Sequence, residues 1–141
     1  MHLSRSAQQM LVVSEQFMDM PDPRLNLVVI RSPDIDRAVE FYRALGLEFK
    51  KHAHGTGPQH YACEWSAFVL ELYPLPDGAV PTTGTRIGFA VNSVDETVAK
   101  LVAIGGTIIS PPADSPWGRR AVVADFDGHR VELTSAIEGA C

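Results

Sequence analysis

Two glutamates occupy comparable places in two strand-like stretches of the sequence. In residues 68–73 and 130–134, apolar side chains alternate with polar ones, and Glu71 and Glu132 belong to the polar series. Because successive side chains of a strand point to opposite faces, both carboxylates face away from the apolar side, and Tyr73 does the same. Paired carboxylates can hold a divalent cation or act as general bases. Glu71 and Glu132 are therefore the first candidates for a functional site.

Three histidines add groups that can change charge near neutral pH. His52 and His54 are two residues apart and share one face of a strand, and His60 follows across a turn-rich loop. Such a trio can bind a metal or supply a general base, although histidines at a domain edge also occur simply as solvated side chains. One of the neighbours His60 and Tyr61 must face the polar side of its strand, which makes these two the stronger candidates. His129 lies in a turn, where we expect it to be exposed.

A loop over residues 116–119 carries a large aromatic side chain, Trp117, and a cation, Arg119. Loops of this kind often close over ligands, and an indole ring can stack on a flat or apolar group. The alternative is that Trp117 caps the core between two turns. Both interpretations stay open at the level of the sequence.

The elements that must position these residues follow one order twice. Asp34 is a suitable N-cap for an amphipathic helix that ends at Gly46, and Gly105-Gly106 ends a second helix. The first series consists of a strand at 25–30, a helix at 35–45, and strands at 48–53, 59–64 and 67–73. The second consists of a strand at 86–91, a helix at 94–104, and strands at 107–110, 121–124 and 130–134, with a turn predicted at Pro111-Pro112.

The repetition also appears as a nearly constant offset of 59 to 61 residues. Asp36 and Asp95 are 59 residues apart, and Glu71 and Glu132 are 61 apart. An internal repeat of this kind is a strong indication of architecture. It predicts one α+β domain over residues 25–138, made of two βαβββ units at about 25–76 and 84–135. We expect the two half-sheets to hold their helices on one side and to face each other across a concave surface.

Composition limits the partners and the compartment. The 141-residue chain has a net charge of −5 and a pI near 5.4, which argues against a nucleic-acid-binding surface. Its two cysteines, Cys63 and Cys141, lack partners at metal-ligand spacing, so we expect free thiols in a reducing compartment. No apolar stretch has the length of a signal peptide core or a membrane span. These features predict a cytoplasmic protein that does not act on a membrane.

Residues 1–24 form an extension that precedes the predicted domain. Met10, Leu11, Phe17 and Met18 recur at seven-residue spacing, which places them on one stripe of a short helix. Such a helix could pack on the domain or on a partner subunit, and a frayed tail is the alternative.

Two motifs carry a family resemblance. The stretch DIDRAVEFYRALGL (residues 34–47) resembles the first helix of the glyoxalase/bleomycin resistance/dioxygenase (vicinal oxygen chelate) superfamily. The stretch DFDGHRVEL (residues 125–133) is similar to the closing turn and last strand of that superfamily. The resemblance implies the paired βαβββ fold of this superfamily. Its members include glyoxalases, epimerases, extradiol dioxygenases, fosfomycin-modifying enzymes and metal-free bleomycin-binding proteins, so the fold does not name a reaction.

The resemblance also implies where a metal would lie. Metal-dependent relatives place one ligand on each of four strands, and the matching positions here are Leu27, Glu71, Arg86 and Glu132. A leucine cannot ligate a metal and an arginine repels one, so we expect no cofactor, and a divalent metal is disfavoured. We expect the Arg86 guanidinium to lie between the two glutamates in place of the metal. The alternative is that Arg86 points to solvent.

Three functions are compatible with these residues, and they leave open whether the chain is an enzyme. The first is a small-molecule-binding protein whose ligand is partly aromatic or cationic. The second is a metal-dependent lyase, isomerase or dioxygenase that uses Glu71 or Glu132 as ligand or base and recruits its metal through His60. The third is a protein that serves in assembly alone.

Exposed sheet edges predict a homodimer, with the cleft either within one chain or between exchanged halves. The residues predicted to bind the small molecule combine charge with aromatic surface. They are Glu71, Arg86, Glu132, Tyr73, Trp117, His60 and Tyr61.

Overall fold

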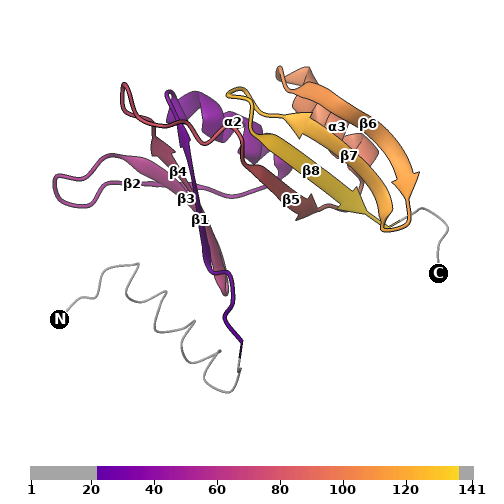
Figure 1. The fold of residues 1–141 in the computed structure, drawn as a ribbon, viewed down its shortest axis with the longest axis horizontal. Coiled ribbons are helices and arrows are strands. Elements are labelled where there is room, and N and C mark those ends of the chain that lie inside the picture. The colour runs from indigo at the N-terminus through magenta and orange to yellow at the C-terminus, as the bar shows by residue number, and fades with distance from the viewer. Residues whose placement is uncertain (1–21, 137–141) are drawn as a thin grey trace.

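Two four-stranded sheets, each covered by one helix, make up the computed structural model, which describes residues 22–136 (Figure 1). The first sheet has the strand order β1-β4-β3-β2 and the second has the order β5-β8-β7-β6. In chain order the elements are β1 (Leu27–Ser32), α2 (Ile35–Leu45), β2 (Lys50–His52), β3 (His60–Trp65), β4 (Phe68–Pro74), β5 (Arg86–Ala90), α3 (Val94–Ala103), β6 (Thr107–Ser115), β7 (Gly118–Ala124) and β8 (Arg130–Ser135). This arrangement confirms the predicted α+β class. The helix predicted within residues 1–20 and the thiol of Cys141 lie outside the described residues.

Helix α2 begins and ends where the sequence predicts. The Asp34 side chain accepts a hydrogen bond from the Arg37 backbone N–H at 3.1 Å, which satisfies one of the free N–H groups of the first turn. At the other end Gly46 takes a left-handed conformation with φ 117°, and its N–H bonds to the Arg43 carbonyl. The buried face between these caps includes Phe41 and Tyr42, and both side chains are fully buried.

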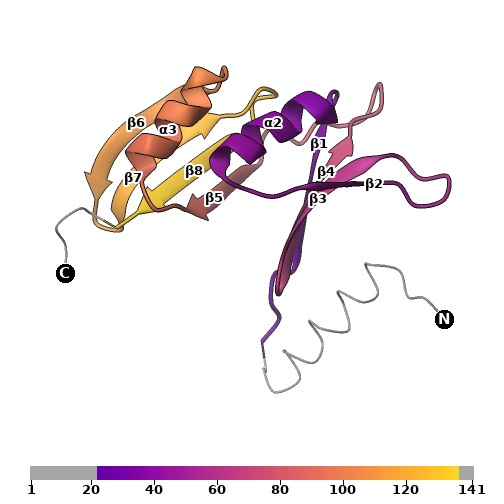
Figure 2. The ribbon, with the colours of Figure 1, turned by 180° about the vertical axis from the view of Figure 1, so that it is seen from behind.

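The core lies between each helix and its own sheet, and the two helices also contact each other (Figure 2). Leu70 and Leu72 of β4 face α2, while Val131 and Leu133 of β8 lie in the same buried cluster. The predicted alternation of β4 and β8 is therefore confirmed, and it directs Glu71 and Glu132 to the faces away from the helices. Cys63 is a free, buried thiol, and burial raises its pKa.

Strand β6 is longer than the sequence indicates. A turn was predicted at Pro111-Pro112, but β6 continues through both prolines to Ser115, so that prediction is wrong. Its pairing with β7 shifts register twice, between Ile108 and Ser110 and between Ser110 and Ala113. A proline removes one donor from a sheet, which an edge strand with bulges tolerates. Because β6 is at the edge of the second sheet, the strand passes through the prolines with a shift in register and does not end there.

A buried polar network joins the first helix to the second sheet. Asp125 accepts hydrogen bonds from the Tyr42 hydroxyl at 2.7 Å and from the backbone N–H groups of Asp127, Gly128 and His129. The Nδ1 atom of His129 lies 2.9 Å from Oδ2 of Asp125, the oxygen that also accepts the Tyr42 hydroxyl. His129 is 1% exposed, so its predicted exposure is wrong. The turn over residues 125–129 is closed by hydrogen bonds from its own backbone N–H groups to Asp125, and this places the His129 ring in the core.

The network reaches the first sheet through the segment that links the two units. The His129 Nε2 atom is 2.7 Å from the Thr82 hydroxyl, and that hydroxyl accepts a hydrogen bond from the Arg31 N–H of β1. Burial alone raises the pKa of Asp125, but hydrogen bonds from His129 and Tyr42 outweigh it and hold this pKa below its ordinary value. The pKa of Tyr42 is raised, first by burial and then by the Asp125 charge.

The two sheets do not stack face to face within one chain. In Figure 1 strands β7 and β8 are seen face-on, whereas β1, β3 and β4 are seen nearly edge-on. The expected concave surface is therefore an open angle between two sheets rather than a closed cleft. Within residues 22–136, no helix has both the length and the apolar character that crossing a membrane requires.

Candidate functional site

The open face of the first sheet carries an aromatic and carboxylate cluster around His60. In the sheet register Ala62 pairs with Glu71, so His60, Ala62, Glu71 and Tyr73 share one face. The His60 ring stacks on the Tyr73 ring at 4.3 Å between centroids and 9° between planes. The His60 Nε2 atom lies 3.4 Å from a Glu71 oxygen, and the His60 side chain is 2% exposed.

Both ring nitrogens of His60 face oxygen atoms. Its Nδ1 lies 3.3 Å from the Pro58 carbonyl oxygen, and its Nε2 faces the Glu71 carboxylate. A neutral imidazole has only one N–H to donate. The N–H can be on Nε2 and donate to the Glu71 carboxylate, or on Nδ1 and donate to the Pro58 carbonyl. The geometry therefore makes His60 and Glu71 a close polar pair in the first sheet.

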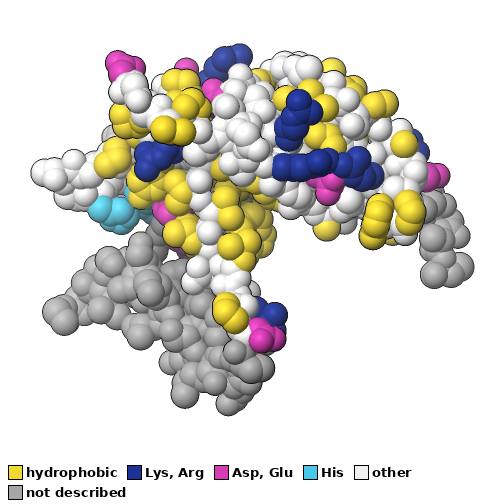
Figure 3. All heavy atoms as spheres, viewed as in Figure 1, with side chains coloured by type: hydrophobic (Ala, Val, Ile, Leu, Met, Phe, Trp, Pro, Cys, Tyr) yellow, Lys and Arg dark blue, Asp and Glu magenta, His cyan; other side chains and the backbone are white. Residues whose placement is uncertain are grey.

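Two further histidines extend this face to the end of the sheet. The ring centroid of His54 is 5.5 Å from that of His60, and the His52 centroid is 5.9 Å from both. Figure 3 shows histidine side chains at the surface in this part of the first sheet. The sequence spacing correctly placed His52 and His54 on one side, and the β2–β3 hairpin brings them to His60.

Tyr61 points the opposite way, toward helix α2. Its hydroxyl donates a 2.6 Å hydrogen bond to the Asp36 carboxylate. The same carboxylate accepts a 3.0 Å hydrogen bond from the Lys51 ammonium group. These hydrogen bonds lower the pKa of Asp36, and the bond to Asp36 raises the pKa of Tyr61. Of the two neighbours predicted as candidates, His60 faces the open side and Tyr61 fastens the helix to its sheet.

The open face of the second sheet carries a charged cluster around Glu132. Oxygen Oε1 of Glu132 lies 3.1 Å from Nη2 of Arg86, 2.7 Å from Nε of Arg120 and 2.6 Å from Nη2 of Arg120. Arg130 pairs with Arg86 in register and points to the same face. Two arginines thus contact one glutamate and a third shares its face, and Figure 3 shows basic side chains gathered beside an acidic one here. The face carries a net positive charge.

Arg120 is a residue that the sequence reasoning missed. It was left outside the strand predicted at 121–124, whereas β7 begins at Gly118. Extending the alternation of Val122 by two residues would have placed Arg120 on the Glu132 face, since Val122 pairs with Glu132 and Arg120 with Thr134. The alternation of the strand therefore indicated the direction of Arg120. The prediction began the strand at residue 121, after the two charged residues Arg119 and Arg120, and so did not use it.

The predicted bridge from Arg86 to both glutamates does not form. Within residues 22–136 the structure joins Arg86 to Glu132, and no ion pair links Arg86 to Glu71. The two sheets lie at an open angle, so Glu71 and Glu132 are on separate faces and each has its own neighbours. Arg86 is 52% exposed, so it is both paired and partly in solvent.

The four positions that hold a metal in metal-dependent relatives do not fit one here. Leu27 offers no ligand atom, and the Glu132 carboxylate is already engaged by two guanidinium groups. A divalent cation at Glu132 would have to displace both arginines against their charge.

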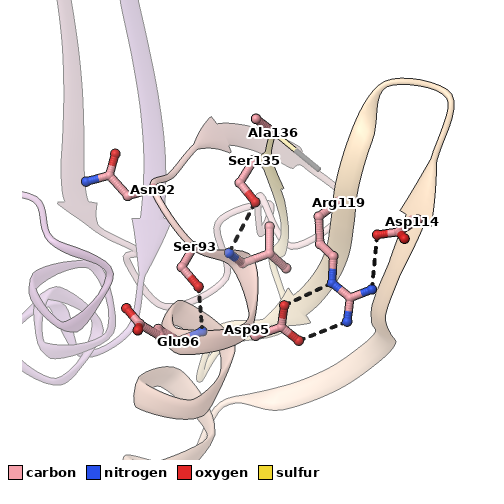
Figure 4. Close-up of a pocket in the computed structure, with 9 residues that line it drawn as sticks. Asn92, Ser93, Asp95, Glu96, Asp114, Arg119, Ser135 and Ala136 are labelled. Atoms are coloured by element: carbon pink, nitrogen blue, oxygen red, sulfur yellow. Dashed lines mark hydrogen bonds and ion pairs between the residues drawn. The ribbon is translucent and has the colours of Figure 1, made fainter. Parts of the chain in front are cut away.

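The loop with Trp117 lies apart from both clusters, in the β6–β7 hairpin. Trp117 is 83% exposed, so the interpretation as a cap on the core is wrong. Its neighbour Arg119 turns toward α3 and binds both Asp95 oxygens, at 2.9 and 3.0 Å, as well as Asp114 at 3.2 Å (Figure 4). A polar pocket of about 600 Å³ opens beside these groups at the start of α3. Because the guanidinium is fully engaged and Glu96 also lines the pocket, the pocket offers a ligand little free positive charge.

An apolar pocket of about 530 Å³ lies where the two sheets meet. Its lining includes Val28 of β1, Phe68 and Leu70 of β4, and Ile87 and Phe89 of β5. Strands β1 and β5 are both at the edge of their sheets, so each has one unpaired side here.

Comparisons with known proteins agree with this architecture. A family model described as the Glyoxalase/Bleomycin resistance protein/Dioxygenase superfamily matches residues 24–133. An uncharacterized protein of Mycolicibacterium smegmatis is 31% identical over 121 residues, which are 84% of this chain and 99% of that protein.

Two further proteins are similar to this chain, one in sequence and one in fold. A probable chloroplastic lactoylglutathione lyase of Arabidopsis thaliana is 29% identical over 78% of this chain, which spans 35% of the lyase. The crystal structure of TnmS3, an antibiotic binding protein from Streptomyces sp. CB03234, superposes with a TM-score of 0.67 at 22% identity. That superposition covers 83% of this chain and 98% of TnmS3.

Proposed function

This chain belongs to the glyoxalase/bleomycin resistance protein/dioxygenase superfamily, and we propose that it is a small-molecule-binding member without a divalent metal at the superfamily's usual positions. The observation that carries the proposal is the engagement of Glu132 by Arg86 and Arg120 at 2.6–3.1 Å. Permanent guanidinium charges occupy the place where a metal ligand would be free. The similarity in fold to an antibiotic binding protein also supports a small-molecule-binding function.

The charges indicate which ligand fits. Arg86, Arg120 and Arg130 outnumber Glu132 on the face of the second sheet, so this face attracts anionic or carbonyl-rich groups. The Tyr73 ring, which stacks on the buried His60 ring and is itself only partly buried, offers a flat aromatic surface on the first sheet. We therefore propose a planar aromatic ligand with an anionic substituent, in place of the cationic ligand that the two glutamates suggested.

A second copy of the chain completes the site in this proposal. One chain presents its two faces at an open angle, and a ligand on either face alone stays largely in solvent. The unpaired edges of β1 and β5 meet at an apolar pocket, which is the kind of surface that an oligomer covers. We propose a homodimer in which the first-sheet face of one copy opposes the second-sheet face of its partner.

The ligand class can be tested with one pair of probes. Anthraquinone-2-sulfonate is flat and anionic, and an anthraquinone with a trimethylammonium group is its cationic counterpart. We expect isothermal titration to give at least tenfold tighter binding of the sulfonate, and Arg120→Gln to weaken it about tenfold. Lys100→Gln on the outer face of α3 removes the same charge and should leave the affinity unchanged. Equal binding of both probes, or binding of neither, overturns the proposal.

A metal-dependent lyase is the second candidate. The likeness to the probable lactoylglutathione lyase favours it, as does the Glu71–His60 pair, which can serve as a base. Turnover of the hemithioacetal of methylglyoxal and glutathione, measured with added Zn²⁺ or Ni²⁺, tests this function directly. Turnover that is lost in Glu71→Gln would replace the binding function by the enzymatic one.

A further inference from the structure

We propose that residues 1–21 pack onto an apolar groove on the helix side of the molecule and thereby hold the two units of the repeat at a fixed angle. One wall of the groove belongs to the first unit and the other wall belongs to the second. The groove is separate from the open faces that carry the His60 and Glu132 clusters. The proposal therefore goes beyond the proposed ligand and does not depend on it.

The groove begins at the apolar pocket between β1 and β5. Val28 pairs with Leu70 in the register of the first sheet, and both side chains belong to the side that faces the core. Ile87 and Phe89 of β5 pack against the same core and form the opposite wall. The pocket therefore opens on the side of the sheets that the helices cover, away from the face of Glu71.

A second hollow extends this pocket toward the helices. It has a volume of about 420 Å³ and shares Trp65 and Phe89 with the first pocket. Leu45 and Leu47, at the end of α2, also line it. Leu25 is 72% exposed and Trp65 is 39% exposed, although both line the groove. A continuous apolar surface of this kind, unlike a single exposed side chain, indicates a site of interaction.

The chain itself supplies an apolar segment at the end of this groove. The structure describes the chain from Asp22, and Leu25, three residues further on, already lines the groove. The preceding segment carries the apolar stripe of Met10, Leu11, Phe17 and Met18 on the helix that the sequence predicts. All four methionines of the chain lie within residues 1–20. Methionine suits an irregular apolar groove because its thioether side chain is flexible and polarizable.

The connection is long enough for the segment to reach along the groove. Phe17 precedes Leu25 by eight residues, and an extended chain of that length spans at most roughly 26–29 Å. Strand β5 lines the groove with all of its five residues and is about 16 Å long. A tethered segment also has a high effective concentration at its own groove. We therefore assign the groove to the segment of the same chain rather than to a second copy.

A segment in this position contacts both units at once. The first unit contributes Val28 and Phe68, and the second contributes Ile87 and Phe89. The angle between the units sets how far apart the two open faces lie, so the segment fixes this distance without contacting a ligand. Because it packs on the helix side, the open faces stay available for the partner subunit of the proposed dimer.

The two tryptophans of the chain provide a matched pair of reporters. Trp65 lines the groove, whereas Trp117 is 83% exposed in the β6–β7 hairpin. The full-length Trp117→Phe protein keeps the first reporter, and the full-length Trp65→Phe protein keeps the second. We expect Phe17→Ser combined with Met18→Ser to raise acrylamide quenching of Trp65 roughly twofold and to shift its emission to longer wavelength. The fluorescence of Trp117 should not change.

A second pair of substitutions in the same segment serves as the control. Gln9→Ala with Gln16→Ala changes two residues at the same seven-residue spacing outside the apolar stripe, and it should leave Trp65 unchanged. Quenching of Trp65 should also stay constant on dilution to the concentration at which sedimentation shows single chains.

Three outcomes overturn the proposal. The first is that the serine variant leaves the quenching of Trp65 unchanged, and the second is that it raises the quenching of Trp117 equally, as loosening of the whole domain would. The third is quenching of Trp65 that rises on dilution, since a second copy then fills the groove. Binding of the anthraquinone probe is a separate measurement, so the proposed ligand and the docked segment can fail independently.

Discussion

Glu71 and Glu132 hold corresponding places in the two repeated units, yet their surroundings differ. Glu71 is 13% exposed and faces an imidazole, whereas Glu132 is 31% exposed and faces two guanidinium groups. An imidazole can lose its charge near neutral pH, and a guanidinium cannot. Repetition of the backbone therefore preserved the direction of the side chain but not its electrostatic role. One sheet holds a carboxylate beside an imidazole, and the other holds a carboxylate beside permanent positive charges.

The largest expected effect comes from releasing the strand that carries Glu132. Asp125 fastens the turn that leads into β8, so Asp125→Ala leaves the Tyr42 hydroxyl and His129 without their acceptor in the core. We expect a loss of about 3–5 kcal/mol in the free energy of unfolding, measured by urea denaturation. A loss below about 1 kcal/mol would show that β8 keeps its place without this network.

The same aspartate predicts how stability depends on pH. Its folded-state pKa lies below the unfolded value near 3.9, so its contribution is complete above that value and is lost as pH falls through the folded pKa. We expect the wild-type protein to lose stability in this acid range. In the Asp125→Asn variant that part of the loss should be absent, and Asp127→Asn serves as the neighbouring control.

A medium effect should sharpen the contrast between the two carboxylates. Glu132→Gln leaves three arginines together without their counter-charge, at a cost of about 1 kcal/mol. Sulfate can then bind the exposed guanidinium groups. We expect sulfate to raise the melting temperature of Glu132→Gln more than that of the wild-type protein or of Glu71→Gln. An equal response in all three proteins would mean that Arg86, Arg120 and Arg130 do not act as one charged cluster.

Local signals in the sequence predicted much of this arrangement. The caps at Asp34 and Gly46 and the strict alternation around Glu71 and Glu132 depend only on residues a few positions apart. These signals correctly gave helix α2 and the face of each glutamate. The repeat offset also gave the order of the elements, because the two units follow one pattern.

Features that depend on residues far apart in the sequence could not be predicted from these local patterns. The buried place of His129 depends on Thr82, which contacts its ring from 47 positions away, and on Tyr42, which bonds to its partner Asp125. No local sequence pattern indicates either contact. The open angle between the sheets likewise arises from packing of whole units, so the bridge by Arg86 could not be judged from alternation alone. The turn predicted at Pro111-Pro112 is absent, because these prolines lie in a strand at the edge of its sheet, where the loss of a backbone donor is tolerated.

The smallest expected effect separates the two arginines that hold Glu132. Arg120 makes two contacts, at 2.7 and 2.6 Å, and is 32% exposed, while Arg86 makes one contact at 3.1 Å and is 52% exposed. Solvent screens the more exposed pair, so Arg120→Ala should cost about 1 kcal/mol and Arg86→Ala about half of that or less, by urea denaturation. A larger loss for Arg86→Ala would mean that its guanidinium also reaches Glu71 in solution, which would close the angle between the sheets. The two glutamates would then share one cation, and their separate roles would have to be abandoned.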